Sequence, residues 1–339
     1  MDLFEIGWEC YAPSQIPDIS FGRVASASRE RFLVWTGKGE ILATISGTLR
    51  QYSAGLPCVG DWVALRAGNV ITEVLPRRTQ LSRKRPGKEV REQVLAANID
   101  ILFIVCGLDR DYNPRRLERY LVLAYESGAR PVILLNKADL RPDALDAVVA
   151  LTQRHAPGVT VLALSALTGL GMESIPAHLT RGQTAALIGS SGAGKSTIVN
   201  CLLAEQRQQT AKVRSADSKG RHTTTRRELI LMPGRYLLMD LPGLRELQLW
   251  ADPEQIDNAF NEVASLAELC RFRDCTHTHE PGCAVRDAGI DEERLAGYRK
   301  LQREVAFLDR QTDANLARET KRRWKAVHKE LRHNPKGRF

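Results

Sequence analysis

The chain has 339 residues, of which 43% are hydrophobic and 26% are charged. This balance is typical of folded globular proteins and excludes wholesale disorder, and the length suffices for two or three domains. Lys and Arg outnumber Asp and Glu by 49 to 40, a net charge of +9 that favours polyanionic partners such as nucleic acids. No apolar run approaches the roughly 20 residues of a membrane span, and the first residues do not resemble a secretory signal.

The first part of the chain alternates short β-type runs with turn residues. Such runs are Phe32–Trp35, Ile41–Ile45 and Asp61–Leu65. Short strands at even spacing predict a small all-β barrel over residues 1–85. An OB-fold, which commonly binds nucleic acid, is one solution, and other small barrels fit the pattern equally well.

A segment rich in Arg and Lys, Arg77–Glu92, comes next and predicts a basic linker that continues to about residue 96. Beyond it, apolar strand-like runs alternate with helical patterns, and this alternation predicts an α/β domain with a largely parallel sheet over residues 97–251. The expected strands are 99–106, 131–135, 159–164, 184–188 and 236–239, and the expected helices are 114–127, 143–154 and 197–203.

A phosphate-binding loop follows the expected strand 184–188. The motif G-x-x-x-x-G-K-[ST] is matched, between a strand and a helix, by Gly189, Ser190, Ser191, Gly192, Ala193, Gly194, Lys195 and Ser196, followed by Thr197. Its backbone N–H groups would surround the phosphates. We expect Lys195 to neutralise the β- and γ-phosphates and the Ser196 hydroxyl to bind Mg²⁺.

A second motif indicates which base is bound. Residues Asn136, Lys137, Ala138 and Asp139 form an N-K-x-D sequence at the end of the expected strand 131–135. A carboxylate at Asp139 can accept hydrogen bonds from the N1–H and 2-amino groups of guanine. We expect Asn136 to shape the pocket and the Lys137 stem to lie over the base. Ser165 and Ala166, after the next strand, fit a loop that closes over guanine.

Two further segments have the character of nucleotide switches. Asp240 and Gly243 belong to a D-L-P-G turn, in which the carboxylate would hold Mg²⁺ through water and the Gly N–H would contact the γ-phosphate. In the run Thr223–Thr225 we favour Thr224 as the hydroxyl that completes the Mg²⁺ shell, with Thr225 as the next choice.

The residue that would orient the attacking water is not obvious. Leu244 follows the D-L-P-G turn, where many GTPases have Gln, and leucine cannot orient water. His222 lies in the Thr-containing loop and titrates near neutrality, which makes it the candidate catalytic group beside Lys195 and Thr224. The alternative is a surface histidine without a catalytic role.

Three of the seven cysteines crowd together near the C-terminus. Cys270, Cys275 and Cys283, together with a histidine at His277 or His279, can supply the four ligands of a closed, structural Zn²⁺ site. An odd number of cysteines without an export signal indicates a reducing cytoplasm. We expect a helical zinc-binding domain over residues 252–339, with a basic tail from Lys321 to Phe339.

The order of the motifs is unusual, because the base reader precedes the phosphate loop. A parallel sheet still gathers the loops at one edge, so the site survives this circular permutation. With Val59-Gly60-Asp61, the G-R-H-T-T-T run from Gly220 and the cysteine cluster, these motifs make the chain resemble the circularly permuted GTPases of the ribosome small-subunit-dependent GTPase A family. The match covers essentially the whole chain and favours His277 as the zinc ligand.

This resemblance implies an OB-fold, a late role in maturation of the 30S ribosomal subunit, and GTP hydrolysis stimulated by that subunit. We therefore expect GTP, GDP, the 30S subunit and its 16S rRNA as partners, Mg²⁺ and Zn²⁺ as cofactors, no membrane association, and a monomer. In the mechanism we expect, GTP orders the switches, the change passes through Leu244–Trp250 to the zinc domain, and hydrolysis releases the rRNA.

Two alternatives belong to other classes. The first is a divergent paralogue, an RNA- or metal-linked GTP-binding module that ribosomes do not stimulate; Trp35 and Trp62 would then give the barrel a different RNA-facing surface. The second is a metal-insertion protein, which would need exposed metal ligands.

Overall fold

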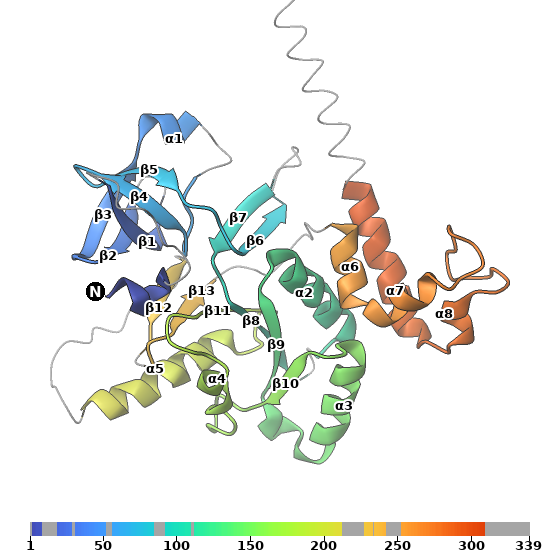
Figure 1. Ribbon diagram of the computed structural model, residues 1–339. Helices are drawn as coiled ribbons and strands as arrows, with labels where there is room; N and C mark the ends of the chain where they lie inside the picture. The colour runs from blue at the N-terminus through green and yellow to red at the C-terminus, as the bar shows by residue number, and fades with distance from the viewer. Residues whose placement is uncertain are drawn as a thin grey trace, which may run out of the picture. The chain divides into compact units, whose positions relative to one another are not determined.

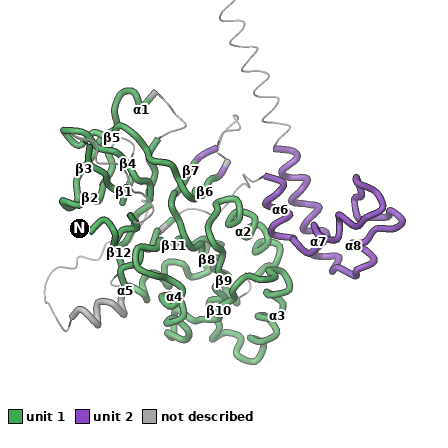
Figure 2. Tube along the Cα trace, viewed as in Figure 1, with its two compact units in different colours: residues 1–82, 94–247 green, residues 83–93, 248–339 purple. Residues whose placement is uncertain are grey.

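The computed structural model describes residues 2–8, 19–28, 31–51, 56–84, 92–109, 112–211, 227–232, 234–241 and 252–308. The chain divides into two compact units (Figure 2), one of residues 1–82 and 94–247 and the other of residues 83–93 and 248–339. Each unit is described by itself below. Across the described ranges, no helix combines the length and the apolar character needed to span a membrane.

Five strands near the N-terminus close into a barrel (Figure 1), as the alternating sequence predicts. They are β1 (Ser20–Ala27), β2 (Phe32–Thr36), β3 (Gly39–Ile45), β4 (Trp62–Arg66) and β5 (Val70–Val74), with the short helix α1 (Gly47–Gln51) between β3 and β4. Each strand pairs with the next in the order β1-β2-β3-β5-β4, and β4 pairs back to β1. The inward side chains, among them Val24, Val34 and Ile71, are fully buried and form the barrel core.

Both tryptophans of the expected RNA-facing surface are buried instead. Trp62 is 1% exposed and Trp35 is 6% exposed, and the Trp62 ring packs against Trp8 with a centroid separation of 4.5 Å. The buried guanidinium of Arg23 lies over the Trp62 ring. These rings therefore belong to the core, and the prediction that they alter an RNA-facing surface is wrong.

Arg23 also ties the barrel to neighbouring parts of the first unit. Its guanidinium donates to the carbonyl oxygens of Ile6 at 2.6 Å, Asn98 at 3.0 Å and Gly60 at 3.2 Å. Ile6 belongs to the 3₁₀ helix η1 (Leu3–Ile6), and Asn98 directly follows β7 (Glu92–Ala97). A buried charge that is hydrogen-bonded in this way fixes the backbone segments around it.

The segment expected to be a basic linker contains two strands. β6 (Gln80–Lys84) and β7 form a separate two-stranded sheet. Leu81 and Leu95 are both buried, and the Arg and Lys residues around Leu81 obscure the strand pattern in the sequence. The domain limits 1–85, 97–251 and 252–339 stay predictions.

The second part of the first unit is a mostly parallel sheet with the expected α/β alternation. Its strands are β8 (Ile101–Gly107), β9 (Arg130–Asn136), β10 (Thr160–Ala163), β11 (Thr184–Gly189), β12 (Glu228–Leu231) and β13 (Leu237–Asp240). The order is β10-β9-β8-β11-β13-β12, with only β12 antiparallel to its neighbour β13. β12 also meets β1 of the barrel at one residue pair, Ser26 and Glu228, so the two sheets are continuous.

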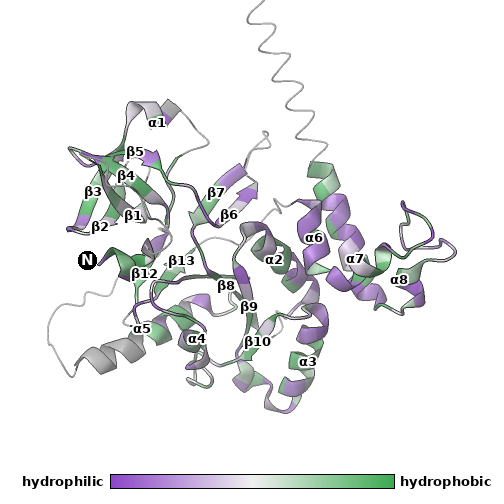
Figure 3. Cartoon of the chain, in the orientation of Figure 1, coloured by the Kyte–Doolittle hydropathy of each residue, from purple (hydrophilic) through white to green (hydrophobic). Residues whose placement is uncertain are grey.

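The hydrophobic strands of this sheet contribute to the core (Figure 3). The helices that accompany the sheet are α2 (Pro114–Ser127), α3 (Leu145–His155), α4 (Ser174–Ala177) and α5 (Lys195–Ala211), with the 3₁₀ turns η4 (Ala138–Leu140) and η5 (Pro142–Ala144) after β9. The predicted bounds of α2 are confirmed: Asn113 caps it, Pro114 opens it, and Gly128 ends it at φ +75°. α5 extends beyond the predicted helix 197–203, since good helix formers continue the sequence.

In the second unit, the described residues after Asp252 form helices and loops. The helices are α6 (Pro253–Ala259), α7 (Asn261–Ala267), α8 (Ala284–Asp287) and a longer one over residues 292–308. Phe260, Val263 and Leu295 are buried between them. The Arg294 guanidinium stacks 3.9 Å from the centroid of the Phe260 ring and donates to Glu262 Oε1 at 2.7 Å.

Candidate nucleotide and metal sites

The predicted nucleotide residues gather at one edge of the central sheet. β8, β9, β11 and β13 run parallel, so their carboxyl ends meet at the same edge. Asn136 ends β9, Gly189 ends β11 and Asp240 ends β13. The permuted order along the chain therefore leaves the spatial grouping intact.

The phosphate loop is built around glycines that no other residue can replace without strain. Gly189 and Gly194 have φ values of +147° and +99°. A Cβ on Gly189 would lie 2.3 Å from the Val105 carbonyl oxygen, and one on Gly194 would lie 2.1 Å from Asn136 Nδ2. Gly192, at φ +85°, also occupies the left-handed region. The loop can thus approach β8 and Asn136 closely only because these side chains are missing.

Lys195, the cationic residue of the phosphate loop, contacts the backbone of that loop. Lys195 begins α5, and its ammonium donates to the carbonyl oxygens of Gly189 at 2.7 Å and Ser190 at 2.6 Å. Ser191, Ser196 and Thr197 are exposed at the same helix end. A helix N-terminus that begins with a lysine favours a bound phosphate group.

Asn136 joins the phosphate loop to the two loops expected to read the base. Its side chain is 2% exposed. Nδ2 donates to the Ala193 carbonyl oxygen at 2.9 Å, and Oδ1 accepts from the Ala166 N–H at 3.0 Å. A single buried amide therefore sets the spacing between the loop expected to bind phosphate and the loop expected to close over the base.

Asp139 presents an acceptor that no described residue satisfies. Its Oδ1 is buried and has no hydrogen-bond partner within the described part of the chain. The Ala138 N–H donates to the Leu164 carbonyl oxygen at 3.1 Å, so this loop lies beside the one that begins at Ser165. Ser165 is fully buried and its hydroxyl accepts from the Thr168 N–H. A buried carboxylate oxygen without a partner suits the paired N–H donors of guanine.

One charged residue at this edge of the sheet was not predicted from the sequence. Asp109, just beyond β8, forms an ion pair with Lys137. Its position after a buried parallel strand is the signal that could have drawn attention to it.

Several predicted residues lie outside what the structure describes. His222, Thr224 and Gly243 belong to undescribed segments, and the Asp240 side chain is likewise not described. Their roles stay predictions.

The second unit brings the four predicted metal ligands together. The ligand atoms of Cys270, Cys275, His277 and Cys283 all lie within 4.8 Å of one another. His277 Nδ1 is 3.4 Å from Cys283 Sγ and 3.6 Å from Cys270 Sγ, and the two sulfur atoms are 3.9 Å apart. Tetrahedral Zn–S and Zn–N bonds of about 2.3 and 2.0 Å require S···S and S···N separations of roughly 3.8 and 3.5 Å. The cluster can therefore hold a metal such as zinc, with His277 rather than His279.

The surroundings of His277 and the hydrogen bonds of Glu280 support a metal site at this cluster. Burial lowers the pKa of His277, which favours the neutral imidazole that binds metals. The Glu280 carboxylate accepts from the Thr276 hydroxyl and from the backbone N–H groups of Thr276, Thr278 and His279. The Thr276 hydroxyl and the backbone N–H groups of Glu280 itself, Thr276 and Thr278 hold the pKa of Glu280 far below its usual value.

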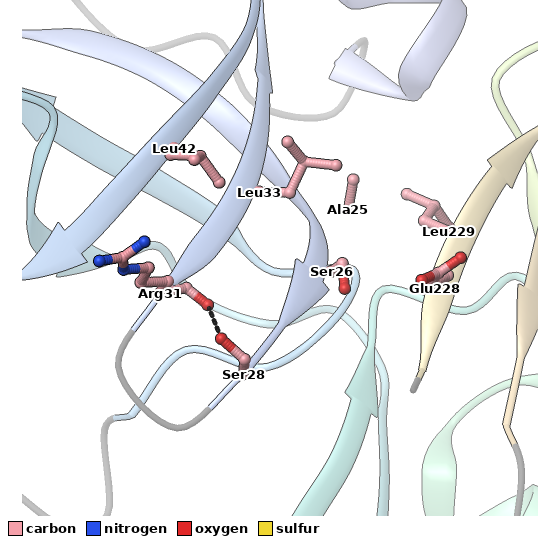
Figure 4. Close-up of a pocket in the computed structure, with 8 residues that line it drawn as sticks. All are labelled: Ala25, Ser26, Ser28, Arg31, Leu33, Leu42, Glu228 and Leu229. Atoms are coloured by element: carbon pink, nitrogen blue, oxygen red, sulfur yellow. Dashed lines mark hydrogen bonds between the residues drawn. The ribbon is translucent and has the colours of Figure 1, made fainter. Parts of the chain in front are cut away.

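A separate pocket of about 440 Å³ lies where the barrel meets β12 (Figure 4). Ala25, Leu33, Leu42 and Leu229 supply apolar walls, and Arg31 and Glu228 supply charges. None of the predicted nucleotide residues lines it.

Comparisons with known proteins agree with this architecture. Residues 74–250 match the RsgA GTPase family. The chain is 47% identical to the small ribosomal subunit biogenesis GTPase RsgA of Opitutus terrae, over 97% of this chain and 96% of that protein. The protein of the same name from Syntrophotalea carbinolica is 42% identical over 97% of this chain and 99% of its own length.

Solved structures show the same fold. The crystal structure of YjeQ from Thermotoga maritima superposes with a TM-score of 0.65 at 27% identity, covering 85% of this chain and 99% of that one. YloQ, a circularly permuted GTPase, superposes with a TM-score of 0.61 at 22% identity, covering 87% and 98%. The family match, the curated relatives and the shared fold lead to one conclusion: the chain belongs to the RsgA GTPase family.

Proposed function

We propose that this protein is a GTP hydrolase that acts in maturation of the small ribosomal subunit. The observation that carries the proposal is the pair of hydrogen bonds by which Asn136 connects the phosphate loop to the loop of Ala166. Nearby, Asp139 offers a buried acceptor oxygen that has no partner among the described residues. A site of this kind combines phosphate and guanine recognition. The names of the Opitutus and Syntrophotalea relatives support the small subunit as the place of action.

Each predicted residue has a chemical task in this proposal. The N–H groups of residues 189–194 and the Lys195 ammonium bind the phosphates, and Asp139 accepts from guanine. Ser196, Thr224 and Asp240 are the residues proposed to hold Mg²⁺, which would neutralise charge that develops on the phosphates. His222 is the proposed group that orients water for hydrolysis.

The barrel and the second unit are proposed to contact RNA. The strand order β1-β2-β3-β5-β4 with α1 between β3 and β4 supports an OB-like fold, a type of barrel that commonly binds nucleic acid. The net charge of +9 supports a polyanionic partner, here the 16S rRNA of the 30S subunit. We propose one structural Zn²⁺ in the second unit, a monomeric chain, and a cytoplasmic site of action, where ribosomes are assembled.

The alternative of a paralogue that ribosomes do not stimulate is not favoured. A relative 47% identical over almost the whole of both chains carries a ribosomal name, and the tryptophans that motivated the alternative are core residues.

Phosphate release from GTP tests the proposal. It is measured with the protein alone, with purified 30S subunits and with 50S subunits, beside a Lys195→Ala variant as the control for contaminating hydrolases. We expect slow release by the protein alone, strong stimulation by 30S only, and none from the variant. Equal rates with 30S, with 50S and without subunits would contradict the ribosomal role and leave a GTP hydrolase that ribosomal subunits do not stimulate.

A further inference from the structure

We propose that Asp109 is a positioning residue of the nucleotide site, which acts by holding the Lys137 side chain where it can cover the guanine base. The Asp109 carboxylate and the Lys137 ammonium form an ion pair. This inference rests on the proposed function, because it assigns a role to a residue of the same guanine site.

The backbone brings these two residues together. Gly107 of β8 and Asn136 of β9 are register partners, and the Leu108 N–H donates to the Asn136 carbonyl oxygen at 2.8 Å. Asp109 and Lys137 are therefore the first residues beyond the last backbone contact of two parallel strands. Their side chains meet because the sheet fixes both chains up to that point.

The pair also lies close to the phosphate loop. A Cβ placed on Gly107 would be 3.2 Å from Asp109 Oδ1 and 3.5 Å from the Ala193 Cα. The Ala193 carbonyl oxygen in turn accepts from Asn136 Nδ2. The ion pair is thus held at the junction between the phosphate-binding and base-binding loops.

Lys137 needs such a partner to occupy one position. Its backbone has φ +65°, which directs the chain sharply away from β9 towards Asp139. Its side chain has four rotatable carbons and loses considerable rotamer freedom when it is ordered over a base. An acceptor that fixes the ammonium before the nucleotide arrives removes part of that entropic penalty from binding.

Charge alone predicts the opposite effect of Asp109. A nucleotide is a polyanion, so a carboxylate beside it repels the ligand, and removal of that carboxylate should tighten binding. If Asp109 positions Lys137, removal of the carboxylate should weaken binding instead. The sign of the change therefore separates the two roles.

The experiment is a titration of the full-length protein with a fluorescent GDP analogue. We compare the unaltered chain with Asp109→Asn, Lys137→Ala and the double variant. Asp109→Asn keeps the size of the side chain and protects the fold, which a thermal melt checks. We expect Asp109→Asn to raise the Kd for GDP about fivefold, as a partly exposed ion pair allows, and to have no effect in the Lys137→Ala background.

Asp143→Asn is the matched control, because it removes an exposed acid from the same edge without touching Lys137. We expect its GDP affinity to stay within twofold of the unaltered chain. Binding by Asp109→Asn that is unchanged or tighter, or a loss that persists in full without Lys137, would overturn the inference while leaving the GTPase proposal intact. Failure of the unaltered chain to bind GDP would overturn both.

Discussion

The nucleotide site and the cysteine cluster are built in opposite ways. The nucleotide residues lie at the ends of buried parallel strands, and the hydrogen bonds of Asn136 join their loops. The cluster lies mainly on the irregular segment between α7 and α8, where Glu280 organises one turn. The sheet therefore builds the first site before any ligand binds, whereas we expect the second site to depend on a bound metal for a large part of its stability.

Metal removal should have the largest effect, a loss of stability in the second unit. If that unit kept its stability without metal, the contrast between the two sites would be wrong. Structural zinc contributes about 10–16 kcal/mol to small zinc domains. We expect stripping by a chelator, or Cys283→Ser, to abolish the cooperative melting of the second unit, measured by calorimetry and circular dichroism. Cys58→Ser, a buried cysteine outside the cluster, is the control and should retain that transition. A second unit that melts unchanged without metal would show that helix packing alone suffices.

The next largest effect should come from Gly194→Ala. The new methyl group would have to lie 2.1 Å from Asn136 Nδ2 on a backbone with φ +99°. We expect the Kd for GDP to rise at least a hundredfold, or about 3 kcal/mol, in an isothermal titration.

Gly158→Ala is its control. Gly158 has φ +75°, but nothing lies within 4 Å of its added Cβ, so this variant isolates backbone strain from the clash. Its GDP affinity should match that of the unaltered chain. If Gly194→Ala and Gly158→Ala bound GDP with similar affinity, the phosphate loop would be held less tightly against Asn136 than we infer from the sheet.

Asn136→Ala should have a smaller but still clear effect. It removes two buried hydrogen bonds and leaves the Ala193 carbonyl and the Ala166 N–H without that partner. At about 1 kcal/mol for each bond, GDP should bind roughly thirtyfold more weakly. Asn113→Ala, which removes only the cap of α2, should lower thermal stability and leave GDP binding unchanged. An equal loss of affinity in both variants would refute the special role of Asn136.

Glu280→Gln should have the smallest of these effects, and the quantity it changes is the affinity for zinc. The carboxylate is not a metal ligand, but it fixes the turn that carries His277, and outer residues of this kind typically tune metal affinity about tenfold. Because the folded-state pKa lies below the unfolded value, the stabilisation is present at neutral pH and is lost only as the pH falls below about 4.5 towards the folded value.

A competition assay with a zinc indicator between pH 6 and 8 checks this prediction. The ratio of the two zinc affinities should be constant over that range. A ratio that collapses at pH 6 would mean that Glu280 is already protonated there.

The motif residues of both sites could be predicted from the sequence. The phosphate loop, the base reader and the cluster are recognisable in the sequence because their chemistry requires fixed residue types at fixed spacing. The bounds of α2 follow equally well from its local caps, Asn113 and Gly128.

Features that depend on distant pairings were missed. Asp109 meets Lys137 only because β8 and β9 pair in one register, which local sequence does not reveal. The sequence of β6 and β7 resembles a charged linker, yet the two strands pair with each other, and Leu81 and Leu95 are buried. The tryptophans of the barrel could be assigned to the surface or to the core, and barrel closure decides for the core.

One measurement tests the contrast between the two sites most directly: the affinities of GDP and ADP for one preparation before and after zinc is stripped. If the sheet builds a guanine site independently of the metal, GDP should bind at least about a hundredfold more tightly than ADP. Adenine lacks the N1–H and 2-amino donors from which we propose that Asp139 accepts hydrogen bonds. Its Kd should change by less than twofold on zinc removal. Equal binding of ADP, or loss of GDP binding together with the metal, would contradict the account.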